Sequence, residues 1–397
     1  MKILYLVNMN ENNRKGLFTV THEKLKYFIK DDKVDDYNIY SIQFYDAGLM
    51  KILKKIKNME IRKKGSDKFS YDGINYKKVY IKVGLINKLL EKTNLDILNY
   101  LPMIIKNKKI IKESDIINSQ WGYPHGRITY FMSKLYDKKY IVNYYGSDVH
   151  TMPIKDSAIR KKVLKVMNNA CKNIFISNKL YESAKSLGYN KENYLITKSG
   201  VNIEKFYPIN EDEIYRLKKE NNLTGYIVGF VGNLNKVKRA DKLIEIFNNI
   251  KINLNEDVSF VVVGDGPLKS SIMKDAKEKN LNILFTGNLN VEGVKDFMNV
   301  MDVMVLPSRN EGFGSVVIEA NACKTIAVGS NIGGIPESML NDNLLVDDGE
   351  NFEMRFADKV IEILKSNYNG DDLINKVRQN FVWEVVAQNE MSAYRMK

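Results

Sequence analysis

Two glutamates in a glycine-rich stretch are the residues of this sequence best suited to chemistry. Glu311 and Glu319 stand eight positions apart in SRNEGFGSVVIEANACKTIAVGSNIGGIPE (308–337), which follows the apolar run VMVL. The pattern predicts a strand, a loop and then a helix beginning near Gly314, and the unpaired amides of a helix start bind phosphate. A carboxylate before that helix and another about a turn inside it can accept hydrogen bonds from hydroxyl groups. The stretch therefore indicates a site for phosphate flanked by two polyols, as in a nucleotide sugar.

Short apolar runs, separated by amphipathic helical patterns, predict the elements that position this stretch. Such runs are typical of parallel strands that are buried on both faces. The first series comprises residues 3–7, 116–118, 140–145, 173–177 and 194–197, and the second comprises 226–232, 258–264, 282–287, 303–307 and 325–329. Two series predict two doubly wound α/β domains. The charged segment 200–225 separates them, and we place the boundary near residue 210.

Glycine-containing loops follow the strands of the second series where each strand ends. Gly232, Gly264 and Gly287 come directly after three of these runs, and the loop 308–315 comes after a fourth. Ligands of open parallel sheets bind outside the carboxyl ends of the strands. We therefore expect these four loops to meet at one edge of the second domain and to form the ligand site there.

The stretch from Glu311 to Glu319 resembles the E-x7-E motif of the retaining GT-B glycosyltransferases, the glycosyl transferases group 1 family, which often reads E-G-F-G-x-x-x-x-E. Other segments resemble blocks of that family in the same order, namely 116–135, 140–150, 199–208, 230–247, 261–268, 330–337 and 381–394. The resemblance covers nearly the whole chain and is strongest from 226 to 350. It implies a GT-B fold, with two doubly wound Rossmann-like domains facing a central cleft.

The resemblance also implies how the chain is divided and what it does. Residues 1–210 would form the acceptor-binding domain and 211–378 the nucleotide-sugar-binding domain, with a helix at 379–397 crossing back to the first domain. The implied activity is transfer of a sugar, with retention of configuration, from a nucleoside diphosphate, with UDP as the expected carrier. The implied acceptor is a saccharide or a lipid-linked molecule of cell-surface polysaccharide biosynthesis, such as capsule.

Site residues carried over from the resemblance have the following roles. Glu311 would bind donor-sugar hydroxyls, Lys238 would neutralise the leaving diphosphate, and Glu319 would bind the ribose. Backbone groups complete the donor site, with the amides of Phe313, Gly314 and Ser315 on sugar and diphosphate, Gly287 and Leu289 at the base, and Gly232 and Gly16 near the phosphates. On the acceptor side the candidates are Asp148 and His125. We expect His125 to lie in a surface loop.

This sequence departs from the family pattern at three places. Asn233 replaces an arginine, so one cation is missing from the diphosphate, and either Lys236 or Arg239 could compensate. Tyr145 replaces a histidine that often contacts the donor sugar. Its hydroxyl could donate a hydrogen bond in catalysis, or its ring could simply pack. The N-terminal loop that ends at Gly16 has this one glycine, where the family has two.

Charge and composition limit the partners. The net charge is +13, and two basic segments, 51–64 and 104–112, interleave lysine with isoleucine and leucine. These segments are either solvated helix faces or a surface for anionic lipid. No nucleic-acid motif is present, and two distant cysteines, with neither signal peptide nor long apolar stretch, favour the cytoplasm, with peripheral attachment at the inner face of the membrane.

We expect no cofactor and no metal. A helix start and Lys238 can stabilise a leaving diphosphate, and the sequence lacks an apolar-flanked D-x-D. Alternatives to the polysaccharide enzyme are a soluble transferase with a small acceptor such as malate, a sugar-nucleotide epimerase, and a non-catalytic nucleotide-sugar-binding protein.

Overall fold

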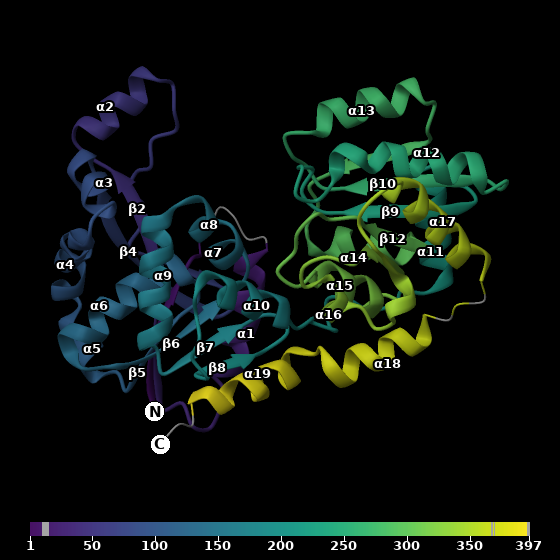
Figure 1. Ribbon diagram of the computed structural model, residues 1–397. Helices are drawn as coiled ribbons and strands as arrows, with labels where there is room; N and C mark the ends of the chain where they lie inside the picture. The colour runs from purple at the N-terminus through teal and green to yellow at the C-terminus, as the bar shows by residue number, and fades with distance from the viewer. Residues whose placement is uncertain (10–15, 367, 369, 395–397) are drawn as a thin grey trace. The chain divides into compact units, whose positions relative to one another are not determined.

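The computed structural model describes residues 1–9, 16–366, 368 and 370–394 (Figure 1). The chain forms two compact units. Unit 1 comprises Met1–Thr197 and Ala387–Lys397, and unit 2 comprises Lys198–Val386. Each is a parallel sheet with helices on both faces, so the fold is GT-B, with two Rossmann-like units as the sequence predicts. Among the described residues, no helix is long and apolar enough to cross a membrane.

Unit 1 is built on an eight-stranded sheet in the order β3-β4-β2-β1-β5-β6-β7-β8, parallel except for the pair of β3 with β4. Its strands are β1 (Lys2–Val7), β2 (Asp36–Asp46), β3 (Lys68–Tyr71), β4 (Ile74–Val83), β5 (Ile116–Ser119), β6 (Lys139–Tyr144), β7 (Lys172–Phe175) and β8 (Tyr194–Ile196). Its helices are α1 (Leu17–Phe28), α2 (Leu49–Ile56), α3 (Leu85–Glu91), α4 (Ile97–Lys106), α5 (Lys108–Glu113), α6 (Arg127–Tyr136), α7 (Ser147–His150), α8 (Met152–Lys155), α9 (Ser157–Asn169) and α10 (Asn178–Leu187).

Unit 2 is built on a six-stranded, fully parallel sheet in the order β11-β10-β9-β12-β13-β14. Its strands are β9 (Tyr226–Val231), β10 (Val258–Val263), β11 (Ile283–Gly287), β12 (Val303–Leu306), β13 (Ile326–Ser330) and β14 (Leu345–Val346). Its helices are α11 (Glu211–Glu220), α12 (Leu243–Asn253), α13 (Lys269–Glu278), α14 (Val291–Val300), α15 (Ser315–Ala322), α16 (Ile335–Ser338), α17 (Phe352–Lys365) and α18 (Asp371–Asn380), while α19 (Trp383–Met391) begins in unit 2 and ends in unit 1.

The division between the units falls between Thr197 and Lys198, earlier than the boundary near residue 210 that the sequence suggests. The segment 198–209 belongs to unit 2 because its backbone is bonded there. Val201 pairs with Val382, and the Val201 amide donates to the carbonyl of Phe381 at 2.7 Å. Farther along, the Ile209 amide donates to the side-chain oxygen of Asn299 at 2.9 Å.

Candidate donor site

The candidate site lies where the strand order of unit 2 reverses. The chain runs outward from β9 through β10 to β11, then returns to place β12 on the other side of β9. A ligand of such a sheet binds at this switch point, outside the carboxyl ends of β9 and β12. The loop after β9 carries Lys238, and the loop after β12 carries Glu311.

Backbone hydrogen bonds join the loops along this edge. The Gly264 amide donates to the carbonyl of Gly287 at 2.8 Å, so the loops after β10 and β11 meet. The Leu234 amide donates to the carbonyl of Asp265 at 3.0 Å, which joins the loops after β9 and β10. The predicted convergence of the glycine loops is therefore observed within unit 2.

Arg309 joins the loop after β12 to the loop after β9. Its amide donates to the Val237 carbonyl at 2.8 Å, and its guanidinium donates to the Lys236 carbonyl at 2.7 Å. The guanidinium also forms a two-pronged ion pair with Asp241, at 2.6 and 3.0 Å. Arg309 is not predictable from the sequence, because no local pattern connects it with partners about 70 positions away.

Glu311 and Lys238 are brought together by these contacts. The Lys238 ammonium donates to Glu311 Oε1, which also accepts from the Ser308 hydroxyl at 3.1 Å. Both side chains are partly exposed, with 24% of Lys238 and 14% of Glu311 accessible. The pair can therefore exchange its partners with a ligand, since neither group is sealed from solvent.

The helix that follows this loop begins as predicted. Gly314 is the residue before α15 and has φ 90°, a left-handed conformation that suits glycine. Glu319 lies inside the helix and is partly buried. Burial raises the pKa of its carboxyl to about 7, although the charge of Lys238 opposes this shift. Among the described residues, the structure shows no hydrogen-bond donor to this carboxylate, so it can accept from a bound hydroxyl group.

Gly333 and Gly334 pack against the backbone of the loop that carries Glu311. The Gly334 amide donates to the Glu311 carbonyl at 2.9 Å. A Cβ atom on Gly334 would lie 2.1 Å from the carbonyl oxygen of Gly312, and one on Gly333 would lie 2.5 Å from that of Glu311. Two adjacent glycines are needed here because backbone packs directly against backbone.

The remaining donor-site predictions fall on the same edge. Phe313 is buried, with its ring 5.9 Å from that of Phe381, so only its backbone could serve a ligand. Ser315 is the first residue of α15, and its hydroxyl donates to that of Ser199 at 3.0 Å. Gly232 follows β9, while Gly287 ends β11 and is followed by the partly buried Leu289.

The structure separates the three cations considered for the diphosphate. Arg239 is buried, with its guanidinium on Asp348 at 2.7 Å and over the Phe352 ring at 3.8 Å, so it fastens the fold. Lys236 is exposed, as is Asn233. Lys238 is the one of the three that meets Glu311, which favours the assignment of the diphosphate to it.

In unit 1, Tyr145 follows β6 and is part of a largely buried polar network. Its hydroxyl accepts from the Lys24 ammonium at 2.8 Å and donates to the side-chain oxygen of Gln120. Lys24 is also bonded to both carboxylate oxygens of Glu390, at 3.1 and 2.9 Å, and Asn143 donates to Glu390 at 2.7 Å. The Tyr145 proton is used inside unit 1, which favours packing over catalysis.

Asp148 and His125 are buried too. Asp148 accepts from the amides of Gly122 and Gly146, each at 2.9 Å, and burial raises the pKa of its carboxyl to about 6 in spite of these bonds. The surface position expected for His125 is wrong: the ring is 1% exposed, and burial lowers its pKa to about 3. It lies in the turn Gly122–Gly126, which is mostly buried because it packs against α6, α9 and β6. Gly16 is exposed at the start of α1. It directly follows residues 10–15 of the N-terminal loop, which lie outside the described residues.

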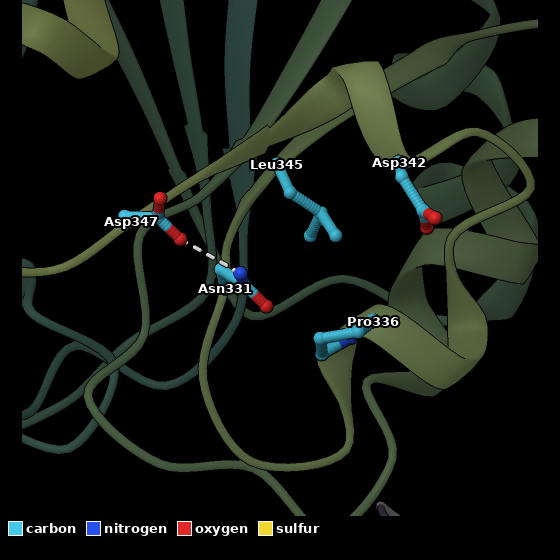
Figure 2. A pocket seen from close by; sticks show the side chains of 5 residues that line it. All are labelled: Asn331, Pro336, Asp342, Leu345 and Asp347. Carbon is cyan, nitrogen blue, oxygen red and sulfur yellow. Dashed lines mark hydrogen bonds between the residues drawn. The ribbon is translucent and has the colours of Figure 1, made fainter.

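A polar recess lies beyond Gly334, at the carboxyl ends of β13 and β14. Figure 2 shows its lining side chains, Asn331, Pro336, Asp342, Leu345 and Asp347. Asn331 donates to Asp347 at 2.7 Å, and the recess holds about 320 Å³. None of the predicted donor-site residues lines it, so it neighbours the site without being part of it.

Comparison with known proteins identifies relatives of this chain. Residues 211–380 match the family model described as Glycosyl transferases group 1. The chain is 25% identical over 362 residues to an uncharacterized glycosyltransferase of Methanocaldococcus jannaschii, covering 86% of this chain and 92% of that protein. It is 24% identical to N-acetyl-alpha-D-glucosaminyl L-malate synthase of Bacillus anthracis, over 70% and 73% of the two chains.

Two further matches bear on the class of protein. The chain is 27% identical to the capsular polysaccharide biosynthesis glycosyltransferase CapM of Staphylococcus aureus, over 47% of this chain and 51% of that one. The crystal structure of Anabaena HepE in complex with UDP and glucose superposes with a TM-score of 0.74, at 16% identity and 99% coverage of both chains. At that identity the superposition supports the fold alone.

Replacing Gly334 by alanine should disturb the donor site. The added methyl group meets the Gly312 carbonyl, and such overpacking costs about 1–3 kcal/mol. We expect a Tm lower by about 2–4 °C for each kcal/mol, together with weaker binding of nucleoside diphosphates. The matched control is Gly65→Ala, where the new atom meets side-chain atoms at ordinary contact distances, the Tyr80 hydroxyl at 3.5 Å and the Lys78 ammonium at 3.9 Å. Equal Tm values for the two variants would contradict the packing argument.

Replacing Glu319 by glutamine should change the pH dependence of stability. The pKa of this carboxyl rises from 4.5 to about 7 on folding, so the folded chain holds the proton more tightly than the unfolded chain. Its contribution is neutral below about pH 4.5, becomes unfavourable as the pH rises and is fully unfavourable above about pH 7. The Tm of Glu319→Gln should match that of the wild type at pH 4.5 and exceed it at pH 8; a difference independent of pH would refute this.

Proposed function

We propose that this chain, a glycosyltransferase whose residues 211–380 belong to the group 1 family, moves a sugar from a UDP-sugar to a saccharide or lipid-linked acceptor with retention of configuration. The observation that carries the proposal is the pairing of Lys238 with Glu311 beside the start of α15, at the switch point of unit 2. The HepE complex with UDP and glucose supports the choice of donor, and the similarity to CapM supports a role in cell-surface polysaccharide biosynthesis.

Each group of the site would have a separate task once a donor binds. The diphosphate would take the Lys238 ammonium from Glu311, and the freed carboxylate would accept hydrogen bonds from the sugar hydroxyls. The amides of Gly314 and Ser315 would face the phosphates, and Glu319 would accept from the ribose. Donor binding thus exchanges one internal ion pair for two contacts with the ligand.

The transfer itself breaks the bond between the anomeric carbon and the β-phosphate oxygen and forms a bond from that carbon to the acceptor oxygen. Negative charge collects on the departing diphosphate, where Lys238 and the helix start stabilise it more strongly than in the ground state. The departing phosphate oxygen takes the acceptor proton, so no separate base is required on the protein.

Substitutions at Lys238 and Glu311 test this proposal. Charged hydrogen bonds contribute about 1.5–3 kcal/mol, so Lys238→Ala and Glu311→Gln should each lower the transfer rate by roughly 10- to 200-fold. The donor is first chosen by a thermal-shift screen of UDP-, GDP- and ADP-sugars. Lys236→Ala is the matched control, because this exposed lysine lies in the same loop. If Lys236→Ala loses more activity than Lys238→Ala, the assignment is wrong.

Transfer should not depend on a divalent metal, since the ammonium and the helix start supply the positive charge that the leaving group needs. We expect the initial rate to be unchanged by EDTA and not to be raised by Mn²⁺ or Mg²⁺. A rate abolished by EDTA and restored by either ion would contradict this account.

A small soluble acceptor is the second candidate, favoured by the similarity to the L-malate synthase over 70% of the chain. Both candidates use the same donor site and differ only in the acceptor. Incubation of the purified chain with its donor and either L-malate or a lipid-linked saccharide distinguishes them by which product forms.

A further inference from the structure

Helices α2 and α3 of unit 1 expose apolar side chains that surface helices normally bury. On α2, Leu49, Ile52 and Ile56 face solvent, and Ile56 is 72% exposed. On α3, Ile86 is 72% and Leu89 is 65% exposed, and none of the residues of this helix is buried. Several exposed apolar side chains gathered on neighbouring helices often mark an interaction site.

The two helices lie next to each other. Both begin directly after strands, α2 after β2 and α3 after β4, and these two strands are parallel neighbours. The Ala47 amide, before α2, donates to the Val83 carbonyl, before α3, at 3.0 Å. Figure 1 shows α2 and α3 together at this end of unit 1. We call the surface formed by residues 49–59 and 85–92 the α2–α3 ridge.

Hydrogen bonds to Asp46 fasten the α2 part of the ridge, although its apolar side chains are exposed to solvent. Asp46, whose side chain is fully buried, accepts from the Lys54 ammonium at 2.7 Å, from the Arg62 amide at 2.8 Å and from the Arg62 guanidinium at 2.9 Å. These bonds hold the pKa of Asp46 well below its usual range, with Arg62 as the leading cause. They fasten α2 and the chain returning from it to the end of β2, so Lys54 is a structural residue.

The other basic segment, 104–112, does not share this character. Ile104 and Ile111 are fully buried beneath α4 and α5, and Ile105 is the exposed apolar side chain there. The lysines of segment 104–112 therefore lie on the solvent-exposed face of ordinary amphipathic helices.

Charge decides which partner fits the ridge. Lys51, Lys55 and Lys57 are exposed on or just after α2, and Lys88 and Lys92 are exposed on or just after α3. Ammonium groups at the border of an apolar surface suit an anionic lipid leaflet, where the aliphatic side chains enter the acyl region and the lysines meet the headgroups.

We propose that the α2–α3 ridge docks on an anionic lipid surface and thereby brings the carboxyl edge of the unit 1 sheet to a lipid-linked acceptor. The loops with Trp121 and Tyr145 leave the same edge, because β5 and β6 run parallel to β2 and β4. This inference rests on the proposed transfer to a lipid-linked acceptor and names the surface that presents it.

Vesicle co-sedimentation of the full chain tests the ridge. The wild type should sediment with phosphatidylcholine vesicles that contain phosphatidylglycerol, much less with phosphatidylcholine alone, and less as salt increases. Ile86→Ser with Leu89→Ser should lower the partition coefficient roughly tenfold or more for each side chain withdrawn from lipid. Lys51→Gln with Lys55→Gln and Lys88→Gln should remove the preference for phosphatidylglycerol.

The matched control is Tyr215→Ser with Ile252→Ser, a pair on unit 2 that is 69% and 64% exposed. It should sediment like the wild type, and all variants should keep the wild-type Tm. The proposal is overturned if the wild type ignores anionic vesicles at low salt, if the control loses as much binding as the α3 variant, or if the ridge residues instead govern self-association in analytical ultracentrifugation.

A measurement of donor binding distinguishes failure of the ridge proposal from failure of the proposed transferase function. A nucleotide sugar should raise the Tm of the α3 variant as it does that of the wild type, because the donor site lies in unit 2. Donor binding and turnover without vesicle binding would overturn the ridge alone. Vesicle binding with no response to any nucleotide sugar would support the ridge and overturn the transferase mechanism.

Discussion

The candidate donor site depends on backbone hydrogen bonds between successive loops at the carboxyl edge of the unit 2 sheet. Gly287 is joined to Gly264, Asp265 to Leu234, and Glu311 to Gly334. A parallel sheet brings these loops to one edge but does not fix their positions relative to one another. The hydrogen bonds between the loops fix those positions. Glycines allow backbone to pack against backbone here, since a Cβ atom on Gly264 would lie 2.0 Å from the Gly232 carbonyl oxygen and one on Gly334 would lie 2.1 Å from that of Gly312. The contacts of Arg309 with Val237 and Lys236 join the loop after β12 to the loop after β9, where Glu311 meets Lys238, 73 positions away in the sequence.

Unit 1 uses its polar residues differently. Lys24 and Glu390 are 366 positions apart and almost wholly buried, and the carboxylate also accepts from Asn143 and Thr197. A buried ion pair is tolerated when hydrogen bonds satisfy its remaining lone pairs, and removal of one partner leaves a costly buried charge. The network thus holds the C-terminal segment on unit 1, and it occupies the hydroxyl of Tyr145. Lys238 and Glu311 of unit 2, by contrast, are partly exposed and can exchange their contact for contacts with a ligand.

Continuous apolar runs predicted the central strands well, because strands covered on both faces have no polar alternation. All ten predicted runs are strands in the structure. The runs missed β2, β3, β4 and β14. In β4, polar and apolar residues alternate except at Lys77 and Lys78, and exposed and buried positions alternate at both ends of the strand, because β4 lies near the sheet edge, where one face is only partly covered.

The candidate site was predictable where its signal was local. Glu311, Gly314 and Glu319 lie within one strand-loop-helix segment, and the helix begins where the sequence places it. The pairing of Glu311 with Lys238, the Arg309 contacts and the burial of His125 were not predictable, because each depends on which distant loop packs against which. The same limit applied to Tyr145, whose partners Lys24 and Gln120 come from other elements.

Fixed ion pairs of arginine, and of Lys24 and Lys54, differ from the contacts that the more exposed lysines can make. Arg62, Arg239 and Arg309 all hold carboxylates in fixed ion pairs that fasten chain segments together. A planar guanidinium suits such permanent pairing, whereas an ammonium is a compact point charge on a flexible stem. Lys238 touches a single carboxylate oxygen and can leave it for a diphosphate, and the exposed lysines of α2 and α3 can meet lipid phosphates in the same manner. In the proposed function, lysine would therefore meet phosphate in two settings: one ammonium at the candidate donor site, and several at the surface that we propose to lie on the membrane.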